Sequence, residues 1–352
     1  MILEKPGLGY NDVSIVPTVI TPIRHRCECL NWENLPIFTA PMSTVVNVEN
    51  FGLWSDNGIT PILPRNISYE TRVKSTGKGA WIAYSLTEFE DLFVTKFDFK
   101  ENARLNILID IANGHMSYLY ALIRHAKINA KKNGCTLKIM TGNIANPSTY
   151  EWLCYNSEVD YIRVGIGSGM GCITSSNTGI HYPMASLIDE CNSIRQKCIS
   201  LQVDAPQIVA DGGIRNYSDV IKALALGANY VMIGGLFAGF FESAAPLIGV
   251  DEIKDWSEKE KLQLIKSNNL QKEFYGMASA KGQEVINGQK TKTAEGIVKL
   301  IPVQYTIAKW VENMEAYLKS AMSYCGCWDL HDFIGKQTLV QNSPAEIAAI
   351  NK

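Results

Sequence analysis

Residues 207–235 read QIVADGGIRNYSDVIKALALGANYVMIGG, and this stretch decides the fold that we expect. Its first run, QIVADGG (207–213), and its last, YVMIGG (230–235), are short and apolar, as buried parallel strands are. Between them, residues 217–226 carry apolar side chains at three- and four-residue spacing, which predicts an amphipathic helix. A strand, a helix and a second strand in this order predict a parallel βαβ unit.

The same alternation extends through most of the chain. Six further apolar runs precede this unit: PIFTAPM (36–42), ITPILP (59–64), GAWIAYS (79–85), NILIDIA (106–112), LKIMTGN (137–143) and YIRVGIG (161–167). Amphipathic stretches such as 116–133 and 183–199 lie between them. Eight parallel strands are the number that closes a (β/α)8 TIM barrel, and a doubly wound open sheet is the alternative. We therefore expect a single α/β barrel domain over residues 1–340, followed by a peripheral tail over 341–352.

Polar residues and glycines fall at or just after the ends of these runs, which favours the barrel. Examples are Asp110, Asn143 and Asp211. In a barrel such positions line one face, where active sites lie. Two glycine-paired turns, ADGGIRN (210–216) and IGGLFAG (233–239), open into helices where barrels commonly bind phosphate. A phosphate ester is therefore the expected ligand, with Asp211 placed to accept hydrogen bonds from a diol such as ribose.

The segment VGIGSGMGCITSSNTGIHYP (164–183) follows the sixth run and presents Cys172, with Thr174 two residues later. Its glycines allow a close approach between backbone and ligand. This layout predicts a nucleophilic cysteine, and a merely packed cysteine is the alternative. In the same segment we interpret His181 as an ordinary loop histidine.

The composition is that of an ordinary globular protein. The chain has 352 residues, 46% of them hydrophobic, and a formal net charge of −2, which gives no electrostatic reason to expect nucleic acid or an anionic membrane as a partner. The sequence shows neither a long apolar span nor a secretory leader, so we expect a cytoplasmic protein. Nine cysteines indicate reduced thiols. The pairs Cys27/Cys29 and Cys325/Cys327 lack the usual zinc spacing, so coincidence is favoured over a metal site.

Several separate motifs carry a resemblance to a known family. They are YNDVSIVP (10–17), PIFTAPMSTVVN (36–47), ILIDIANGH (107–115), MTGNIA (140–145), the cysteine loop, VADGGIRN (209–216), GGLFAG (234–239) and FYGMAS (274–279). In order and spacing the chain resembles the IMP dehydrogenase and GMP reductase family over nearly its full length. The resemblance implies a barrel without the inserted regulatory domains that the dehydrogenases usually carry. It also implies a cysteine thiolate that bonds to C2 of a purine nucleotide, where a nicotinamide cofactor exchanges hydride.

The flap over about 277–302 separates the two branches of that family. Dehydrogenases activate a hydrolytic water with an Arg-Tyr pair there, and this chain has neither residue between Met277 and Pro302. Reductases place a carboxylate before glycine, which matches Glu295 in TAEGIVKLIP (293–302). The resemblance thus implies NADPH-dependent reductive deamination of GMP, or of an analogue such as dGMP, to IMP and ammonia. Cys172 would form a thioimidate, and Thr174 and Glu295 would relay a proton to the leaving amine. The alternatives are an NAD-dependent IMP dehydrogenase and a catalytically silent purine-nucleotide sensor.

The remaining site residues are implied by the same resemblance. Asp211 would bind the ribose, and the residues expected around the phosphate are Ser168, Gly213, Gly234, Gly235 and Tyr275. Those expected near the purine are Met277, Ala278 and Lys292. Those expected at the nicotinamide are Asp110, Ala112, Asn113 and Gly114. Backbone carbonyls of Gly167, Gly169 and Cys172 match a loop that often holds potassium in relatives, which usually form homotetramers.

Departures from the family pattern gather around substrate recognition. Relatives usually read GxGPGSxC, but Ser168 replaces the proline and Met170 replaces the serine that contacts phosphate. Ala294, like Lys292, stands where reductases tend to have a different residue near the guanine, and Arg65 follows Pro64 where a His-Lys pair is common. These changes leave room for a divergent substrate, such as a deoxynucleotide or a modified purine nucleotide. The charged run 251–263 predicts either a solvated helix or an excursion.

Overall fold

The structure is a computed structural model that describes residues 7–76, 78–248, 256–267, 269–288 and 296–350. Eight parallel strands form one sheet: β2 (Ile37–Thr39), β3 (Ile62–Leu63), β4 (Lys78–Tyr84), β5 (Arg104–Ile109), β6 (Thr136–Ile144), β7 (Tyr161–Val164), β8 (Gln207–Asp211) and β9 (Tyr230–Ile233). Their order is β2-β9-β8-β7-β6-β5-β4-β3. A parallel bridge between Phe38 and Thr60 joins β2 to the segment before β3 and closes the ring. The predicted (β/α)8 barrel is therefore confirmed, and the open-sheet alternative is wrong.

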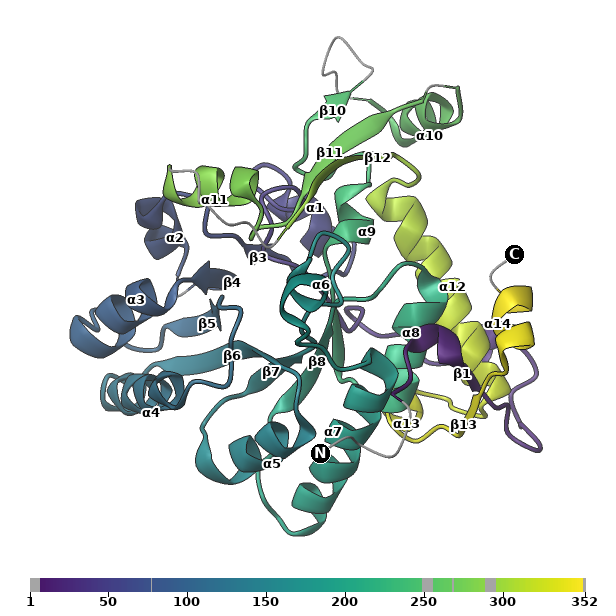
Figure 1. The fold of residues 1–352 in the computed structure, drawn as a ribbon, viewed down its shortest axis with the longest axis horizontal. Coiled ribbons are helices and arrows are strands. Elements are labelled where there is room, and N and C mark those ends of the chain that lie inside the picture. The colour runs from purple at the N-terminus through teal and green to yellow at the C-terminus, as the bar shows by residue number, and fades with distance from the viewer. Residues whose placement is uncertain (1–6, 77, 249–255, 268, 289–295, 351–352) are drawn as a thin grey trace.

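Helices surround the barrel as the alternating pattern predicts (Figure 1). The outer ring consists of α1 (Phe51–Asp56), α2 (Tyr69–Ser75), α3 (Leu86–Phe89) with a π-helical continuation (Glu90–Thr95), α4 (Ser117–Lys132), α5 (Pro147–Asn156), α7 (Met184–Ser200), α8 (Tyr217–Leu226) and α12 (Ile307–Tyr324). Local sequence sets their starts. Asn216 caps α8 through its side chain, which accepts a hydrogen bond from the Asp219 amide, and the Asp219 carboxylate accepts one from the Asn216 amide in turn. Pro147 opens α5 behind the Asn146 cap.

Aromatic side chains fill the amino-terminal half of the barrel interior. Phe38, Trp81, Tyr161 and Tyr230 come from four different strands, and the Trp81 and Tyr161 rings meet edge to face with centroids 5.2 Å apart. Such contacts contribute about 0.5–1.5 kcal/mol each beyond burial. With this end of the barrel plugged, the carboxyl ends of the strands are left to form the ligand site.

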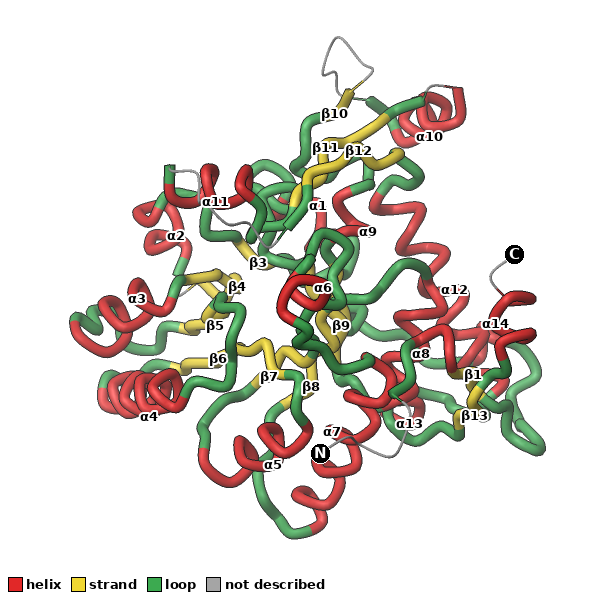
Figure 2. Tube along the Cα trace, viewed as in Figure 1, coloured by secondary structure: helices red, strands yellow, loops and turns green. Residues whose placement is uncertain are grey.

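A small antiparallel sheet stands apart from the barrel strands (Figure 2). It contains β10 (Leu247–Ile248), β11 (Gln271–Tyr275) and β12 (Val298–Pro302), and it is accompanied by α10 (Glu258–Ser267) and α11 (Ala280–Asn287). Within the charged run at 251–263, residues 251–255 lie outside the described residues, and the part from Glu258 onward is helical. The antiparallel sheet was not predicted from the sequence. Because β12 is the last part of the expected flap, this sheet fixes one end of it.

The tail packs on its own chain. Strand β13 (Leu339–Gln341) pairs antiparallel with β1 (Val13–Ile15), and α14 (Pro344–Ile350) follows it. The Asn342 amide donates to the carbonyl of Asp12 and extends this contact. The boundary expected at 341 therefore falls within a strand. Two short helices, α6 (Thr174–Thr178) and α9 (Gly235–Ala238), lie over the barrel mouth, and α13 (Leu330–Phe333) precedes β13. No described helix is long and apolar enough to span a membrane.

Candidate active site

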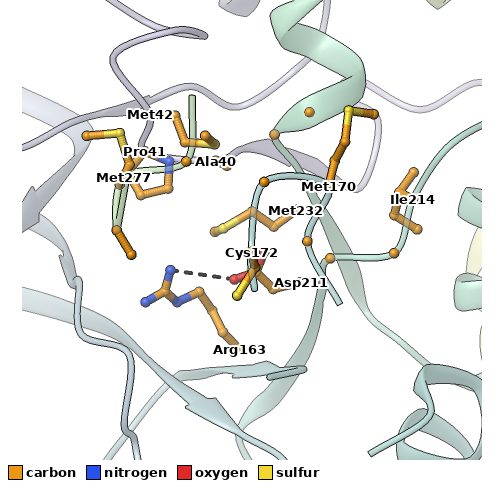
Figure 3. A pocket seen from close by; sticks show the side chains of 18 of the residues that line it. Ala40, Pro41, Met42, Arg163, Met170, Cys172, Asp211, Ile214, Met232 and Met277 are labelled. Carbon is orange, nitrogen blue, oxygen red and sulfur yellow. Dashed lines mark ion pairs between the residues drawn. The ribbon is translucent and has the colours of Figure 1, made fainter. Parts of the chain in front are cut away.

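A cavity opens at the carboxyl ends of the strands, and it contains the cysteine loop (Figure 3). Its walls come from segments that are far apart in sequence: residues 40–42 after β2, residues 169–172 after β7, residues 211–214 at the end of β8, and Phe274 with residues 276–278 at the end of β11. Asp110, Arg163, Met232, Gly234 and Gly235 complete the lining. The barrel therefore brings the predicted nucleophile and the predicted ribose-binding carboxylate to one place.

Cys172 lies half-buried between β7 and α6, and its Sγ lies 3.2 Å from Oγ1 of Thr174. Its amide donates to the carbonyl of Gly169, which tightens the loop. Other cysteines are packed in the core: Cys154 is buried, and burial raises the pKa of its thiol to about 12. Such a thiol stays protonated and unreactive at neutral pH. Cys172 is instead presented on a cavity wall beside a hydroxyl group.

The flap returns to the cysteine loop through its backbone. Cys172 and Gly296 form an antiparallel bridge, and the Ile297 amide donates to the Gly171 carbonyl over 3.1 Å. A Cβ atom on Gly296 would lie 2.8 Å from the Ser279 amide nitrogen, which explains glycine at this position. The predicted general acid, Glu295, immediately precedes Gly296 in sequence and lies outside the described residues. Lys292 and Ala294 also lie outside them.

Four charged side chains and one amide form a network at the base of the site. Arg163 contacts Asp110 at 3.3 Å and Asp211 at 3.6 Å, and Figure 3 shows the second of these ion pairs. Arg65 donates through Nε to Asp110 at 3.0 Å, and Asn143 donates through Nδ2 to Asp211 at 2.8 Å. Desolvation raises the pKa of Asp211, while Arg163 and Asn143 oppose that rise.

Arg163 is a site residue that the sequence analysis missed. It stands in the apolar run YIRVGIG, where every neighbour suggested a buried strand. Its side chain is only 5% exposed and nevertheless reaches the cavity wall. A charged residue inside a buried strand needs a partner, and that was the signal available before the structure.

A second cavity adjoins the first. Its lining includes Ala112, Asn143 and Thr174, and it shares Cys172 and Asp211 with the main cavity. Two ligand groups could therefore approach the same sulfur from two sides. This arrangement suits a reaction in which a substrate and a second organic molecule meet at one atom.

Comparison with known proteins identifies the family of this chain. A model of the IMP dehydrogenase / GMP reductase domain matches residues 94–350. The chain belongs to the IMP dehydrogenase / GMP reductase family. Among curated members of the family, the GMP reductase of Streptococcus agalactiae serotype III (strain NEM316) is 30% identical over 340 residues, covering 93% of this chain and 92% of that protein. The GMP reductase of Streptococcus suis (strain 05ZYH33) is 30% identical over 345 residues, covering 94% of each chain.

Several residues carried over from the IMP dehydrogenase / GMP reductase family line the main cavity. On the expected phosphate side these are Gly213, Gly234 and Gly235, and on the expected purine side Met277 and Ala278. Ser168 lies in the second cavity and donates through Oγ to the backbone carbonyl of Asp211 at 3.3 Å. Their roles toward a ligand stay predictions.

Met170 gives the expected phosphate side of this family member an unusual surface. A Cβ atom placed on Gly235 would lie 2.7 Å from Cβ and 3.0 Å from Sδ of Met170, so the thioether covers that glycine turn. Tyr275 does not reach the cavity wall in this structure. Its hydroxyl accepts a hydrogen bond from Ser43 at 3.0 Å, and the neighbouring Phe274 lines the cavity instead.

The segment expected at the nicotinamide divides into two parts. Asp110 lines the main cavity and Ala112 lines the second one. Asn113 is exposed and accepts a hydrogen bond from the His115 amide. Gly114 is buried against β6, where a Cβ atom would lie 2.8 Å from Cα of Gly142. Asp110 and Ala112 therefore face the two cavities, whereas Asn113 and Gly114 hold the shape of the loop.

The carbonyls expected to bind potassium are partly engaged within the loop. The Gly167 carbonyl accepts from Oγ of Ser175 at 3.0 Å, and the Gly169 carbonyl accepts from the Cys172 amide. Each carbonyl oxygen keeps a second lone pair, and oxygen ligands suit a hard cation. In the two C-x-C pairs, Cys29 and Cys327 direct their thiols at backbone carbonyls. Within the described ranges, the one cluster of metal-ligating side chains is Asp329, His331 and Asp332, which includes neither pair.

Proposed function

We propose that this protein catalyses the NADPH-dependent reductive deamination of GMP, or of a close guanine nucleotide analogue, to IMP and ammonia. The observation that carries the proposal is Cys172, presented where two cavities meet, with Thr174 beside its sulfur and the flap residue Gly296 paired to its backbone. The curated relatives cited above carry the name GMP reductase and match nearly the whole chain.

The chemistry begins with attack of the Cys172 thiolate on C2 of the guanine. The C2–N bond breaks, the amino group takes a proton and leaves as ammonia, and a thioimidate remains on Cys172. Thr174 stands near the sulfur and is suited to pass that proton, with Glu295 as its source. Glu295 is supported by its sequence position beside Gly296, which bridges Cys172.

The second half of the reaction needs a hydride at C2. A reduced nicotinamide would supply that hydride when bound. The C2–S bond would then break, which returns the thiolate to Cys172 and releases IMP. The residues present fit such a cofactor, because the second cavity reaches the sulfur and has small walls at Ala112 and Gly165. Asp110, held by Arg65, lies on the adjoining main cavity and can accept a hydrogen bond from an amide group that extends into it.

The identity of the nucleotide depends on the two ends of the main cavity. Asp211 provides a carboxylate acceptor for sugar hydroxyls at one end. At the other end Met170 offers no hydroxyl donor, so other groups would hold the phosphate of either nucleotide. A deoxynucleotide such as dGMP would lose one of the hydrogen bonds at Asp211. We therefore place GMP first and test dGMP beside it.

The decisive experiment follows the absorbance of reduced nicotinamide with GMP or dGMP and NADPH, together with ammonia release. We expect turnover that disappears in Cys172→Ala and falls by at least about a hundredfold in Glu295→Gln, as expected for loss of general acid catalysis. Cys135→Ala is the matched control, because that cysteine is also partly exposed but lies after α4, away from the cavity. Turnover of Cys172→Ala would contradict the proposal.

The reverse pairing tests the alternative within the family. An IMP dehydrogenase would produce reduced nicotinamide from IMP and NAD, and it needs a base that activates water. Neither arginine nor tyrosine occurs between Met277 and Pro302, so we expect no such turnover. A silent nucleotide sensor would bind the nucleotide without oxidising NADPH or forming an adduct on Cys172.

Three further properties belong to the proposal. We propose a potassium ion on the carbonyls of Gly167, Gly169 and Cys172, which predicts faster turnover in potassium chloride than in sodium chloride at equal ionic strength. We also propose a cytoplasmic homotetramer. Strongly exposed apolar side chains support assembly, among them Val19 at 97% and Ile20 at 84% exposure. Sedimentation velocity gives the oligomeric state directly.

A further inference from the structure

One buried cation lies between two carboxylates that belong to different parts of the site. The Arg163 side chain is 5% exposed, and its guanidinium contacts Asp110 through Nη2 at 3.3 Å and Asp211 through Nη1 at 3.6 Å. Asp110 follows β5 and Asp211 ends β8, so the two carboxylates come from opposite sides of β7, the strand that carries Arg163.

The strand next to Arg163 leaves room for it. Gly142 on β6 is its register partner. A Cβ atom at Gly142 would lie 2.9 Å from Cβ of Arg163 and 2.5 Å from its carbonyl oxygen. A side chain at this position on β6 would therefore displace the arginine from its place between the carboxylates.

A second buried arginine, Arg72, lies away from the cavity and serves as a comparison for the contacts of Arg163. Arg72, with a side chain 3% exposed, forms a two-pronged contact with Glu88 and donates to the carbonyls of Ile67 and Ala83. All three of its nitrogens are engaged. Arg163 instead makes longer contacts with two different carboxylates and donates through Nη2 to the Ile111 carbonyl at 3.2 Å, while its buried Nε has no hydrogen-bond partner among the described residues. The hydrogen bonding of Arg163 is therefore less complete than that of Arg72.

Each carboxylate also has a partner that the other lacks. Arg65 contacts Asp110, and Asn143 contacts Asp211. Arg163 thus contacts both carboxylates, whereas Arg65 contacts only Asp110 and Asn143 contacts only Asp211. Single substitutions can therefore remove either the contact common to both carboxylates or the contact specific to one of them.

We propose that Arg163 is a positioning residue that fixes Asp110 and Asp211 at one separation and so aligns the cofactor and the nucleotide with each other at Cys172. The inference rests on the proposed function, which assigns the sugar to Asp211 and the nicotinamide to Asp110. Its physical basis is the rigid planar fork of the guanidinium, which sets two acceptors in a fixed relation. Without that cation, two like charges would face each other across the site.

The test measures direct binding of GMP alone and of NADPH alone by calorimetry, without turnover. We expect Arg163→Gln to weaken both ligands by about tenfold or more, which corresponds to the loss of roughly one charge-assisted contact each. Arg65→Gln should weaken NADPH only, and Asn143→Ala should weaken GMP only. Arg163→Lys should keep the normal affinity for at most one of the two ligands, because a single ammonium group cannot hold both carboxylates in one plane.

Loss of only one ligand in Arg163→Gln, or of neither, would overturn the inference while the proposed function stood. Failure of the unmodified protein to bind either ligand would overturn both. Should Arg163→Gln not fold, Arg163→Lys decides the question. Weakening of one or both ligands at an unchanged melting temperature supports the positioning role, and full retention of both ligands refutes it.

Discussion

At the scale of single residues, Met170 departs from the family pattern on the expected phosphate side of the cavity. Its thioether lies against the Gly235 turn, where the family pattern expects a serine that donates to phosphate. We predict that Met170→Ser lowers the Kd for GMP by about ten- to a hundredfold, because one charge-assisted hydrogen bond contributes about 1.5–3 kcal/mol. Calorimetric titration measures the change, with guanosine as a ligand that lacks the phosphate and should be unaffected.

Met170→Ala is the control for that substitution, since it removes the thioether without adding a donor. An equal gain in Met170→Ala would show that bulk, rather than the missing hydroxyl, limits the binding of phosphate. A gain for guanosine in Met170→Ser would contradict the assignment of this end of the cavity to the phosphate.

At the scale of elements, a buried lysine ties the small sheet to the segment that connects α9 to β10. Lys272 on β11 donates through Nζ to the carbonyls of Ser243 and Ala245, and desolvation lowers its pKa from 10.5 to about 8. Between these two values the unfolded chain binds more protons than the folded one, so the contribution of Lys272 to stability rises with pH. At neutral pH Lys272 is protonated in both the folded and the unfolded chain, so its burial lowers the free energy of unfolding by an amount that does not depend on pH.

We therefore predict that the free energy of unfolding increases more steeply between about pH 8 and pH 9.5 in the unmodified protein than in Lys272→Met. Urea titrations at a series of pH values give both curves, and only their difference is used, because tyrosines titrate in both proteins near the upper limit. Parallel curves would show that Lys272 keeps an ordinary pKa in the folded state.

At the scale of the whole molecule, a strand near the amino terminus, β1, pairs with a strand near the carboxyl terminus, β13. Strand β13 covers β1, and Val13 is only 5% exposed there, whereas α14 has no buried residue. We predict that ending the chain after Gln341 changes the melting temperature little. Ending it after Thr338 should lower that temperature by several degrees, because Val13 and the backbone of β1 become exposed. Scanning calorimetry of both truncations is the measurement, and equal melting temperatures would contradict the pairing.

Local sequence was enough for the barrel and for part of the site. The eight apolar runs lie where the strands are, because buried parallel strands leave a nearly continuous apolar signature. The helices predicted over 116–133, 183–199 and 217–226 agree with α4, α7 and α8 to within one residue at each end. Cys172 and Asp211 could be singled out because chemistry in a barrel gathers after strand ends, which are visible in sequence.

By itself, then, the sequence determined the barrel, the family and the presented cysteine, because periodicity, glycine turns and motif order are properties of neighbouring residues. Only the tertiary structure decided which distant groups meet. It paired Gly296 with Cys172, turned Tyr275 toward Ser43, and set one guanidinium between Asp110 and Asp211. These contacts join positions far apart in the chain, and packing and charge rather than local pattern choose among the possible partners.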